Sequence, residues 1–161
     1  MCTAPVGGTC PVGCPLCICA SPDTPVATPR GNVPIAALAV GDIVLSVDRG
    51  TVTAVPVLAI GRVPARHHSV QRVVLETGQI LEISSPHPTA DGRTFGDLRA
   101  GDSLDGVAIR DVRTVPYAHP FTYDILPESE SGAYFAGGVL VGSTLSQRAT
   151  QAVAPTVPMS R

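Results

Sequence analysis

The sequence predicts an all-β domain in which one β-subdomain is used twice. The chain holds 16 glycines and 16 prolines among its 161 residues, and these residues interrupt helices and favour short strands joined by turns. Short apolar segments bounded by turn residues, such as 43–47 ahead of Asp48-Arg49-Gly50, are typical of strands in hairpins. A stretch that ends in Gly41-Asp42 returns in shortened form at Gly101-Asp102, which indicates an internal repeat.

Composition limits what the domain does. Trp is absent and Phe and Tyr number three each, so the core must be packed from Val, Ile, Leu and Ala. The net charge of -2 leaves no basic stripe for phosphates, and we expect no nucleic-acid partner. No apolar run reaches the ~20 residues of a membrane span, and the N-terminus lacks the pattern of a secretory signal. We expect a monomer without a cofactor.

The first copy of the subdomain takes up residues 24–83. Its expected elements are an edge-like strand at 24–28, since proline is tolerated at a sheet edge, a turn at 30–32, at most one helical turn at 35–38, and a strand at 43–47. A long run at 52–63, bent or bulged because of Pro56, and a hairpin of 70–75 with 79–83 complete it.

The second copy begins where the first one ends. Residues 85–92 mirror residues 24–31 as a short proline-containing strand and turn, and Phe95 and Leu98 take the places of Ile35 and Leu38. The expected remainder is a strand at 107–112 and a hairpin in which residues 121–126 and 133–141 are joined by a polar turn at 128–132. We therefore expect a pseudo-twofold body without a true helix.

The cysteines are confined to the start of the chain, at Cys2, Cys10, Cys14, Cys17 and Cys19. A fold stapled by disulfides would distribute its cysteines, so the core does not depend on bridges. The thiols of Cys10, Cys14 and Cys17 are weak metal candidates, because structural zinc sites usually pair two knuckles across a longer loop. The other interpretation of residues 1–18 is a flexible leader with incidental or disulfide-paired thiols. Residues 146–161 lack periodicity and are expected to be disordered.

Three sequence blocks carry a resemblance to a known family. Cys19 is followed five positions later by Thr24, and residues 35–44 read Ile-x-x-Leu-x-x-Gly-Asp-x-Val. Residues 78–88 contain Ser84 and His87 in the spacing of a Thr-x-x-His block, and residues 123–125 and 134–141 complete the set. Together these blocks resemble the Hedgehog/intein (Hint) domain over residues 19–145. The type resembled is bacterial and intein-like.

The resemblance implies self-cleavage, with the chain's own N-terminal segment as substrate. The Cys19 thiolate would attack the carbonyl of Ile18 and convert the amide into a thioester, which water, a thiol or an amine then resolves. A free thiol has a pKa of ~8.5, so the cysteine needs activation. By the family pattern His87 protonates the Cys19 nitrogen, Ser84 polarises the scissile peptide, and Asp124 tunes the cysteine.

The C-terminal junction departs from the family pattern. Splicing members end in His-Asn, whereas this chain has Gly142 and Ser143, followed by Thr144. Serine cannot form the succinimide that releases the downstream segment, so cleavage without splicing is expected. The alternative function is an inactive Hint-fold module for binding or presentation, whose leader holds a metal or disulfides.

The catalytic hypothesis makes a spatial prediction. Cys19, Ser84, His87 and Asp124 should converge in one shallow cleft, because proton transfer needs hydrogen-bond reach or one bridging water. The histidines His67, His68 and His119 match no block and are expected to be solvated loop residues or to serve local partners.

Overall fold

The structure, a computed structural model, describes residues 19–145. The expectations for the leader, including Cys10, Cys14, Cys17 and Ile18, and for residues 146–161 lie outside the described residues. Within 19–145 the chain forms strands and two short 3-10 helices. They are β1 (Pro25–Thr28), β2 (Gly31–Pro34), η1 (Ile35–Ala37), β3 (Ile43–Asp48), β4 (Thr51–Pro64), β5 (Ser69–Leu75), β6 (Ile80–Ile83), η2 (Phe95–Asp97), β7 (Ser103–Leu104), β8 (Val107–Pro116), β9 (Phe121–Pro127), β10 (Tyr134–Ala136) and β11 (Val139–Val141).

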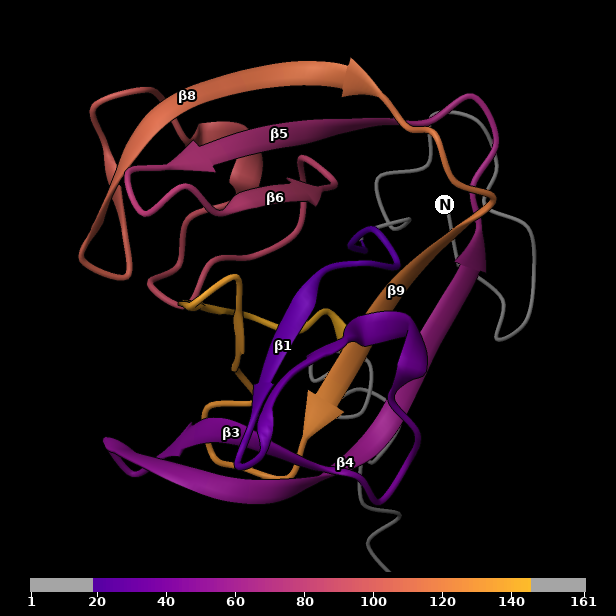
Figure 1. Ribbon diagram of the computed structural model, residues 1–161, viewed down its shortest axis with the longest axis vertical. Coiled ribbons are helices and arrows are strands. Elements are labelled where there is room, and N and C mark those ends of the chain that lie inside the picture. The colour runs from indigo at the N-terminus through magenta and orange to yellow at the C-terminus, as the bar shows by residue number, and fades with distance from the viewer. Residues whose placement is uncertain (1–18, 146–161) are drawn as a thin grey trace, which may run out of the picture.

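The strands form two sheets, and the all-β prediction is confirmed. One sheet has the order β2-β1-β10-β3-β4-β9, with β11 paired to β10, and the other has the order β6-β5-β8-β7. Figure 1 shows β5, β6 and β8 together at one end of the molecule and β3 with the start of β4 at the other. No helix among residues 19–145 is long and apolar enough to cross a membrane.

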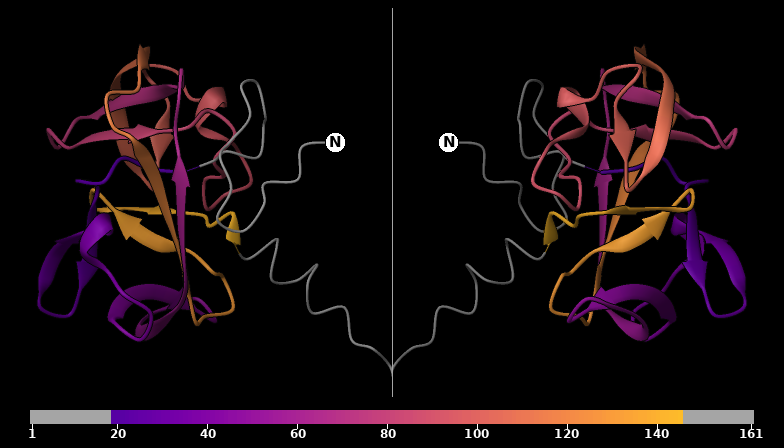
Figure 2. Two further views of the ribbon diagram at one scale, coloured as in Figure 1. Left: turned by 90° about the vertical axis from the view of Figure 1, so that its right-hand side faces the viewer. Right: turned by 90° about the vertical axis from the view of Figure 1, so that its left-hand side faces the viewer.

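β4 is the longest strand and changes partner along its length. It pairs with β3 as far as Pro56 and with β9 from Val57 onward, with a register shift between Val57 and Ala59. The expected bend or bulge is therefore confirmed as a register shift just after Pro56, where the strand changes partner. Figure 2 shows β4 running from one end of the molecule toward the other.

The two copies of the subdomain repeat the same backbone hydrogen bonds. Leu38 donates to Ile35 as Leu98 donates to Phe95. The amides of Ala39 and Arg99 donate to the carboxylates of Asp42 and Asp102, at 2.8 and 2.9 Å. Gly41 and Gly101 adopt φ of 92° and 91°, a conformation that favours glycine. The predicted equivalence of these residues is confirmed.

Upstream of these helices, the predicted alignment of the copies is wrong by two residues. The Ile35 amide donates to the Thr24 carbonyl at 2.9 Å, and at the equivalent place the Phe95 amide donates to the His87 carbonyl at 3.0 Å. Thr24 therefore corresponds to His87 and not to Ser85. The intervening β1–β2 hairpin has no full counterpart in the second copy.

Three further predictions about strands are wrong. The hairpin expected of 121–126 with 133–141 does not form, because β9 pairs with β4, whereas β10 pairs with β1, β3 and β11. Residues 85–92 form no strand, because only isolated bridges pair Pro88 with Thr94 and Thr89 with Val141. β1 is not an edge strand, since it lies between β2 and β10. Pro25 is tolerated there because it is the first residue of the strand, where no ladder amide is required of it.

The core lies between the sheets and is mostly aliphatic, as the composition predicts. Its largest fully buried apolar side chains are Tyr134, Phe95, Ile35, Leu75, Leu81, Ile83, Leu98, Leu104 and Ile125. Ile35 and Phe95, the first residues of the two 3-10 helices, both insert into this core. The helical turns therefore serve to bury one large side chain in each copy.

Candidate catalytic site

The first described residues run between two strands from different sheets. Ala20 forms bridges with Ile83 at the end of β6 and with Tyr123 in β9. The amides of Ala20 and Tyr123 donate to each other's carbonyls at 2.7 and 2.8 Å. Continuing both antiparallel registers by one residue sets Cys19 opposite Ser84 on one side and Asp124 on the other. Segments far apart in the sequence thus meet at the cysteine.

Ser84 makes direct contact with the backbone of Cys19. The Cys19 amide donates to Ser84 Oγ at 3.4 Å, and this oxygen also lies 3.0 Å from the Cys19 carbonyl oxygen. The Ser84 amide donates to the same carbonyl at 3.2 Å. The fourth contact of the serine is with His68, whose Nε2 lies 2.7 Å from Ser84 Oγ. Ser84 therefore holds both the amide and the carbonyl of Cys19.

His87 is fully buried and only partly satisfied. Its amide donates to the Ser84 carbonyl at 3.0 Å, and its Nε2 lies 2.8 Å from the Gly142 carbonyl oxygen. The ring packs edge-on against Phe95. Its Nδ1 is buried and has no hydrogen-bond partner among the described residues. A buried polar atom without a partner is uncommon and frequently marks a functional site.

Asp124 is fully buried and accepts four hydrogen bonds. Its Oδ1 accepts from the Ile125 amide and the Tyr134 hydroxyl, both at 2.9 Å. Its Oδ2 accepts from the amide and the hydroxyl of Thr144. Burial, followed by the charge of Asp124, raises the pKa of Tyr134 well above its usual value, so this tyrosine is a neutral donor. The carboxylate therefore fastens the end of the described chain to β9.

The C-terminal junction lies next to the same residues. Ser143 and Thr144 are buried, and the Ser143 hydroxyl accepts from the Leu145 amide at 3.2 Å. The Gly142 amide donates to the Pro88 carbonyl at 3.0 Å, and a Cβ on Gly142 would lie 3.1 Å from that oxygen. His87 and Asp124 thus hold the junction at Gly142 and Thr144, respectively.

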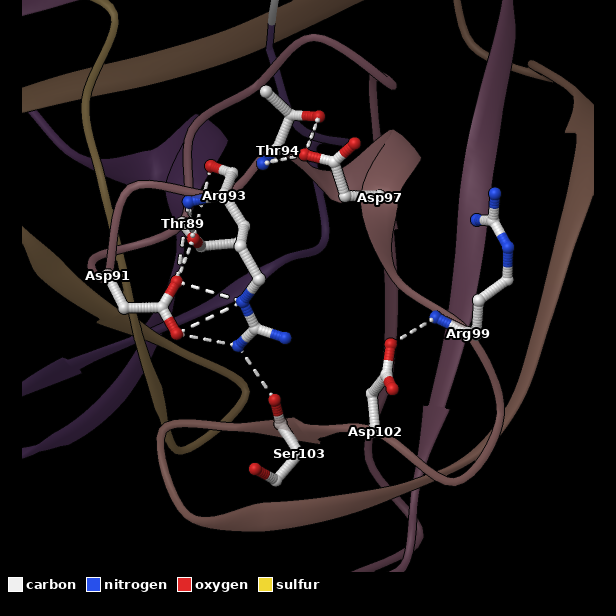
Figure 3. Close-up of polar contacts among 8 residues, drawn as sticks. All are labelled: Thr89, Asp91, Arg93, Thr94, Asp97, Arg99, Asp102 and Ser103. Atoms are coloured by element: carbon white, nitrogen blue, oxygen red, sulfur yellow. Dashed lines mark hydrogen bonds and ion pairs between the residues drawn. The ribbon is translucent and has the colours of Figure 1, made fainter.

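A polar network fixes the loop that follows His87 (Figure 3). The Thr89 hydroxyl donates to Asp91, and Arg93 pairs with the same carboxylate at 2.7 Å. Thr94 and Asp97 cap η2 reciprocally. The Arg93 side chain lowers the pKa of Asp91, and the Thr94 amide lowers the pKa of Asp97. The loop keeps its shape without a regular strand.

The structure brings the four predicted site residues to one region but not to a shallow cleft. Cys19 is 3% exposed, and Ser84, His87 and Asp124 are fully buried. The prediction of a cleft is wrong because the segment around Ala20 is paired on both sides and fills the space between the sheets. The catalytic roles stay predictions. No group of His, Cys, Asp and Glu in residues 19–145 is arranged to hold a metal ion.

Two polar residues of this region were not predicted as site residues. Tyr134 donates to Asp124, and His68 contacts Ser84. Thr144, predicted as part of the C-terminal junction, also binds Asp124. Tyr134 lies in one of the blocks that resemble the Hint domain, so the sequence could have indicated that it lies near the site. His68 precedes β5 in a polar loop, and no spacing or motif connects it with Ser84. His67 is exposed and His119 packs against Tyr117, as expected of loop histidines.

Comparison with known proteins gives matches only at the level of structure. No family model matches the sequence, and no curated protein matches it significantly. The MchDnaB-1 intein is 26% identical with a TM-score of 0.63, over 76% of this chain and 98% of that one. The gp41-1 intein is 23% identical with a TM-score of 0.61, over 78% and 98%.

A third structural match comes from a domain described as intein-like. The bacterial intein-like domain from Clostridium thermocellum, solved in solution, has a TM-score of 0.65. It is 20% identical and covers 78% of this chain and 96% of that one. In all three matches nearly the whole of the known domain is covered. These matches cover most of this chain and nearly all of each matched chain, and they confirm the Hint-type fold.

Proposed function

We propose that this chain, a Hint-type domain by its fold, cleaves its own backbone at the Ile18–Cys19 peptide bond. One observation carries the proposal. The amide nitrogen of Cys19, which would be the leaving group, lies against Ser84 Oγ at 3.4 Å inside the protein. The contact is long for a hydrogen bond, as contacts at catalytic sites often are before the reaction begins.

The proposed reaction is an N–S acyl shift. The Cys19 thiolate attacks the Ile18 carbonyl carbon, a carbon–sulfur bond forms, and the carbon–nitrogen bond breaks as the nitrogen takes up a proton. The thiol proton leaves to solvent or to a base, so protons balance. His87 is the proposed acid. Its Nε2 faces the Gly142 carbonyl and carries a hydrogen, so its buried Nδ1 takes up a proton first and then delivers it to the Cys19 nitrogen.

An external nucleophile completes the reaction. The thioester lies uphill of the amide because amide resonance is lost, and it therefore accumulates little. Water, a thiol or an amine attacks the thioester carbon and releases residues 1–18. The new N-terminus is then Cys19.

Splicing is not part of the proposal. Ser143 stands where an asparagine would cyclise, and a serine side chain has no amide nitrogen for that step. The hydroxyl and amide of Thr144 are both engaged by Asp124. We assign Asp124 the role of holding this junction. Its charge is also proposed to tune the reactivity of the Cys19 thiol.

Intact mass tests the proposal. The full chain, purified and incubated with excess thiol, should release residues 1–18 with the thiol attached at their C-terminus and leave a product beginning at Cys19. Cys19→Ala should abolish release, and Ser143→Ala should leave it unchanged. Release that persists in Cys19→Ala, or a cut at another bond, would remove this mechanism. A folded chain that never cleaves would point instead to the binding or presentation module.

A further inference from the structure

His68 is a polar residue beside the proposed scissile peptide that the reaction above does not use. It lies between β4 and β5, in the loop after Pro64, and its Nε2 is 2.7 Å from Ser84 Oγ. This is shorter than either contact between Ser84 Oγ and Cys19. The distance is that of a good hydrogen bond.

The three contacts of the Ser84 hydroxyl determine where its proton lies. A hydroxyl has one proton and two lone pairs. The Cys19 carbonyl accepts only, so the proton of Ser84 must point toward it, and the Cys19 amide donates only. All three contacts are satisfied together only if His68 Nε2 carries a hydrogen and donates it to the remaining lone pair. The geometry thus defines a tautomer of His68.

Two contacts with Tyr117 hold His68 in this place. Its backbone carbonyl accepts from the Tyr117 amide at 2.8 Å, and its ring meets the Tyr117 ring edge-on with centroids 5.8 Å apart. The Tyr117 hydroxyl in turn donates to the Phe121 carbonyl. Burial lowers the pKa of His68, which favours the neutral imidazole, and burial raises the pKa of Tyr117. The imidazole is anchored by the segment that leads into β9.

We infer that His68 is a positioning residue for self-cleavage, which donates Nε2–H to Ser84 and thereby fixes the Ser84 hydroxyl with its proton on the Cys19 carbonyl and a lone pair on the Cys19 amide. The inference rests on the proposed function and adds a residue to it. Without His68 the Ser84 hydroxyl would be free to turn away from Cys19, because no other described group donates to its remaining lone pair.

The role of His68 in the reaction is orientation without net proton loss. As the carbon–nitrogen bond breaks, the Cys19 nitrogen gains a lone pair and becomes an acceptor. This lone pair takes up the proton from the acid, while Ser84 Oγ goes on accepting from the N–H of the same nitrogen and so steadies the leaving group. His68 keeps its proton throughout, and the proton that the nitrogen takes up still comes from the acid proposed above.

A double-mutant cycle tests whether His68 acts through Ser84. His68→Ala should slow thiol-induced release of residues 1–18 about tenfold, the effect of one ordinary hydrogen bond. In a Ser84→Ala background the same change should have no further effect. An equal tenfold loss in both backgrounds would overturn the inference. His68→Gln, which keeps a donor NH₂ group, should restore most of the rate, and failure to do so would also count against it.

The matched control is the neighbouring histidine. His67 is exposed and has a φ of 50°, and asparagine tolerates this conformation. His67→Asn should cleave at the unaltered rate, and melting temperatures of all variants should show that the fold is kept. A slow His67→Asn variant would trace the effect to the loop and not to the His68 ring.

A second measurement does not require cleavage. Nitrogen-15 chemical shifts of the His68 ring in the full chain should report the neutral tautomer with hydrogen on Nε2, and Ser84→Ala should reduce this preference. The opposite tautomer in the unaltered chain would overturn the inference even if the domain cleaves. If the domain never cleaves while the tautomer is as expected, the proposed function fails and the His68–Ser84 bond stands.

Discussion

Two turns in this molecule have the same backbone hydrogen bonds, but their side chains make different contacts. In the first copy the Thr24 amide donates to Ser21 at 3.1 Å, and in the second the His87 amide donates to Ser84 at 3.0 Å. The residues after Ser21 and Ser84, Pro22 and Ser85, accept from the second residue of η1 and η2. Turn 21–24 and turn 84–87 therefore occupy equivalent places in the pseudo-twofold fold.

The side chains of the two turns are satisfied in different ways. The hydroxyls of Ser21 and Thr24 lie 3.1 Å apart and bond to each other. Ser84 instead bonds to His68 and Cys19, and His87 reaches Gly142. The first turn is closed on itself, whereas the second connects to both ends of the described chain. The same backbone thus serves stability in one copy and, by our proposal, chemistry in the other.

The largest difference between the turns should appear at their last residue. His87→Ala should slow thiol-induced cleavage on the order of a hundredfold, in line with loss of a general acid. Thr24→Val, at the equivalent place in the first turn, should leave the rate unchanged. Rates from intact mass spectrometry check both. Equal rates for His87→Ala and the unaltered chain would break the functional side of the comparison.

Replacement of Ser84 should slow cleavage more than replacement of Ser21, but the difference should be smaller than that between His87 and Thr24. Ser84→Ala should slow cleavage about thirtyfold, because the scissile peptide loses an oriented hydroxyl beside its nitrogen. Ser21→Ala should cleave at the unaltered rate, since the Ser21 hydroxyl bonds to the Thr24 hydroxyl within its own turn. The same mass assay applies. A slow Ser21→Ala variant would mean that the first turn also governs Cys19, two residues away.

Changes in the first turn should lower the stability of the fold, because the hydroxyls of Ser21 and Thr24 bond to each other. Ser21→Ala should lower the free energy of unfolding by about 1–2 kcal/mol, because it leaves the buried Thr24 hydroxyl without this partner. The double change Ser21→Ala with Thr24→Val should recover most of the loss, since both polar groups are then removed. Denaturant unfolding measures both. An additive loss in the double variant would contradict a closed pair.

The smallest expected effect is a response to acid confined to the second copy. The pKa values of Asp91 and Asp97 are lowered by contacts with Arg93 and Thr94, respectively, so these contacts stabilise the fold fully above about pH 4, and the stabilisation is lost progressively as the pH falls through the lowered pKa values. Amide hydrogen exchange at pH 3, corrected for intrinsic rates, should show Phe95 less protected relative to pH 6. Ile35, whose helix η1 has no acidic residue in its first turn, should change less.

Local chemistry made much of the fold predictable. Glycine and proline spacing located the turns, and the Ile-x-x-Leu-x-x-Gly-Asp pattern located η1 and its copy, because these features depend on residues within one turn of each other. The resemblance to the Hint domain is confirmed by the fold and named the residues that lie together. The strand expected at 85–92 failed because side-chain contacts of Thr89, Asp91 and Arg93 replaced ladder hydrogen bonds.

The amino-acid sequence by itself determined the all-β class, the repeated subdomain and the candidates Cys19, Ser84, His87 and Asp124. Only the tertiary structure decided that Thr24 corresponds to His87, that the site is buried, and that His68 reaches Ser84. These outcomes depend on pairing between distant segments: Ala20 with both Ile83 and Tyr123, and the loop before β5 with the loop before β9. Short motifs do not encode such pairings, because the free energy that selects them comes from burying the whole core at once.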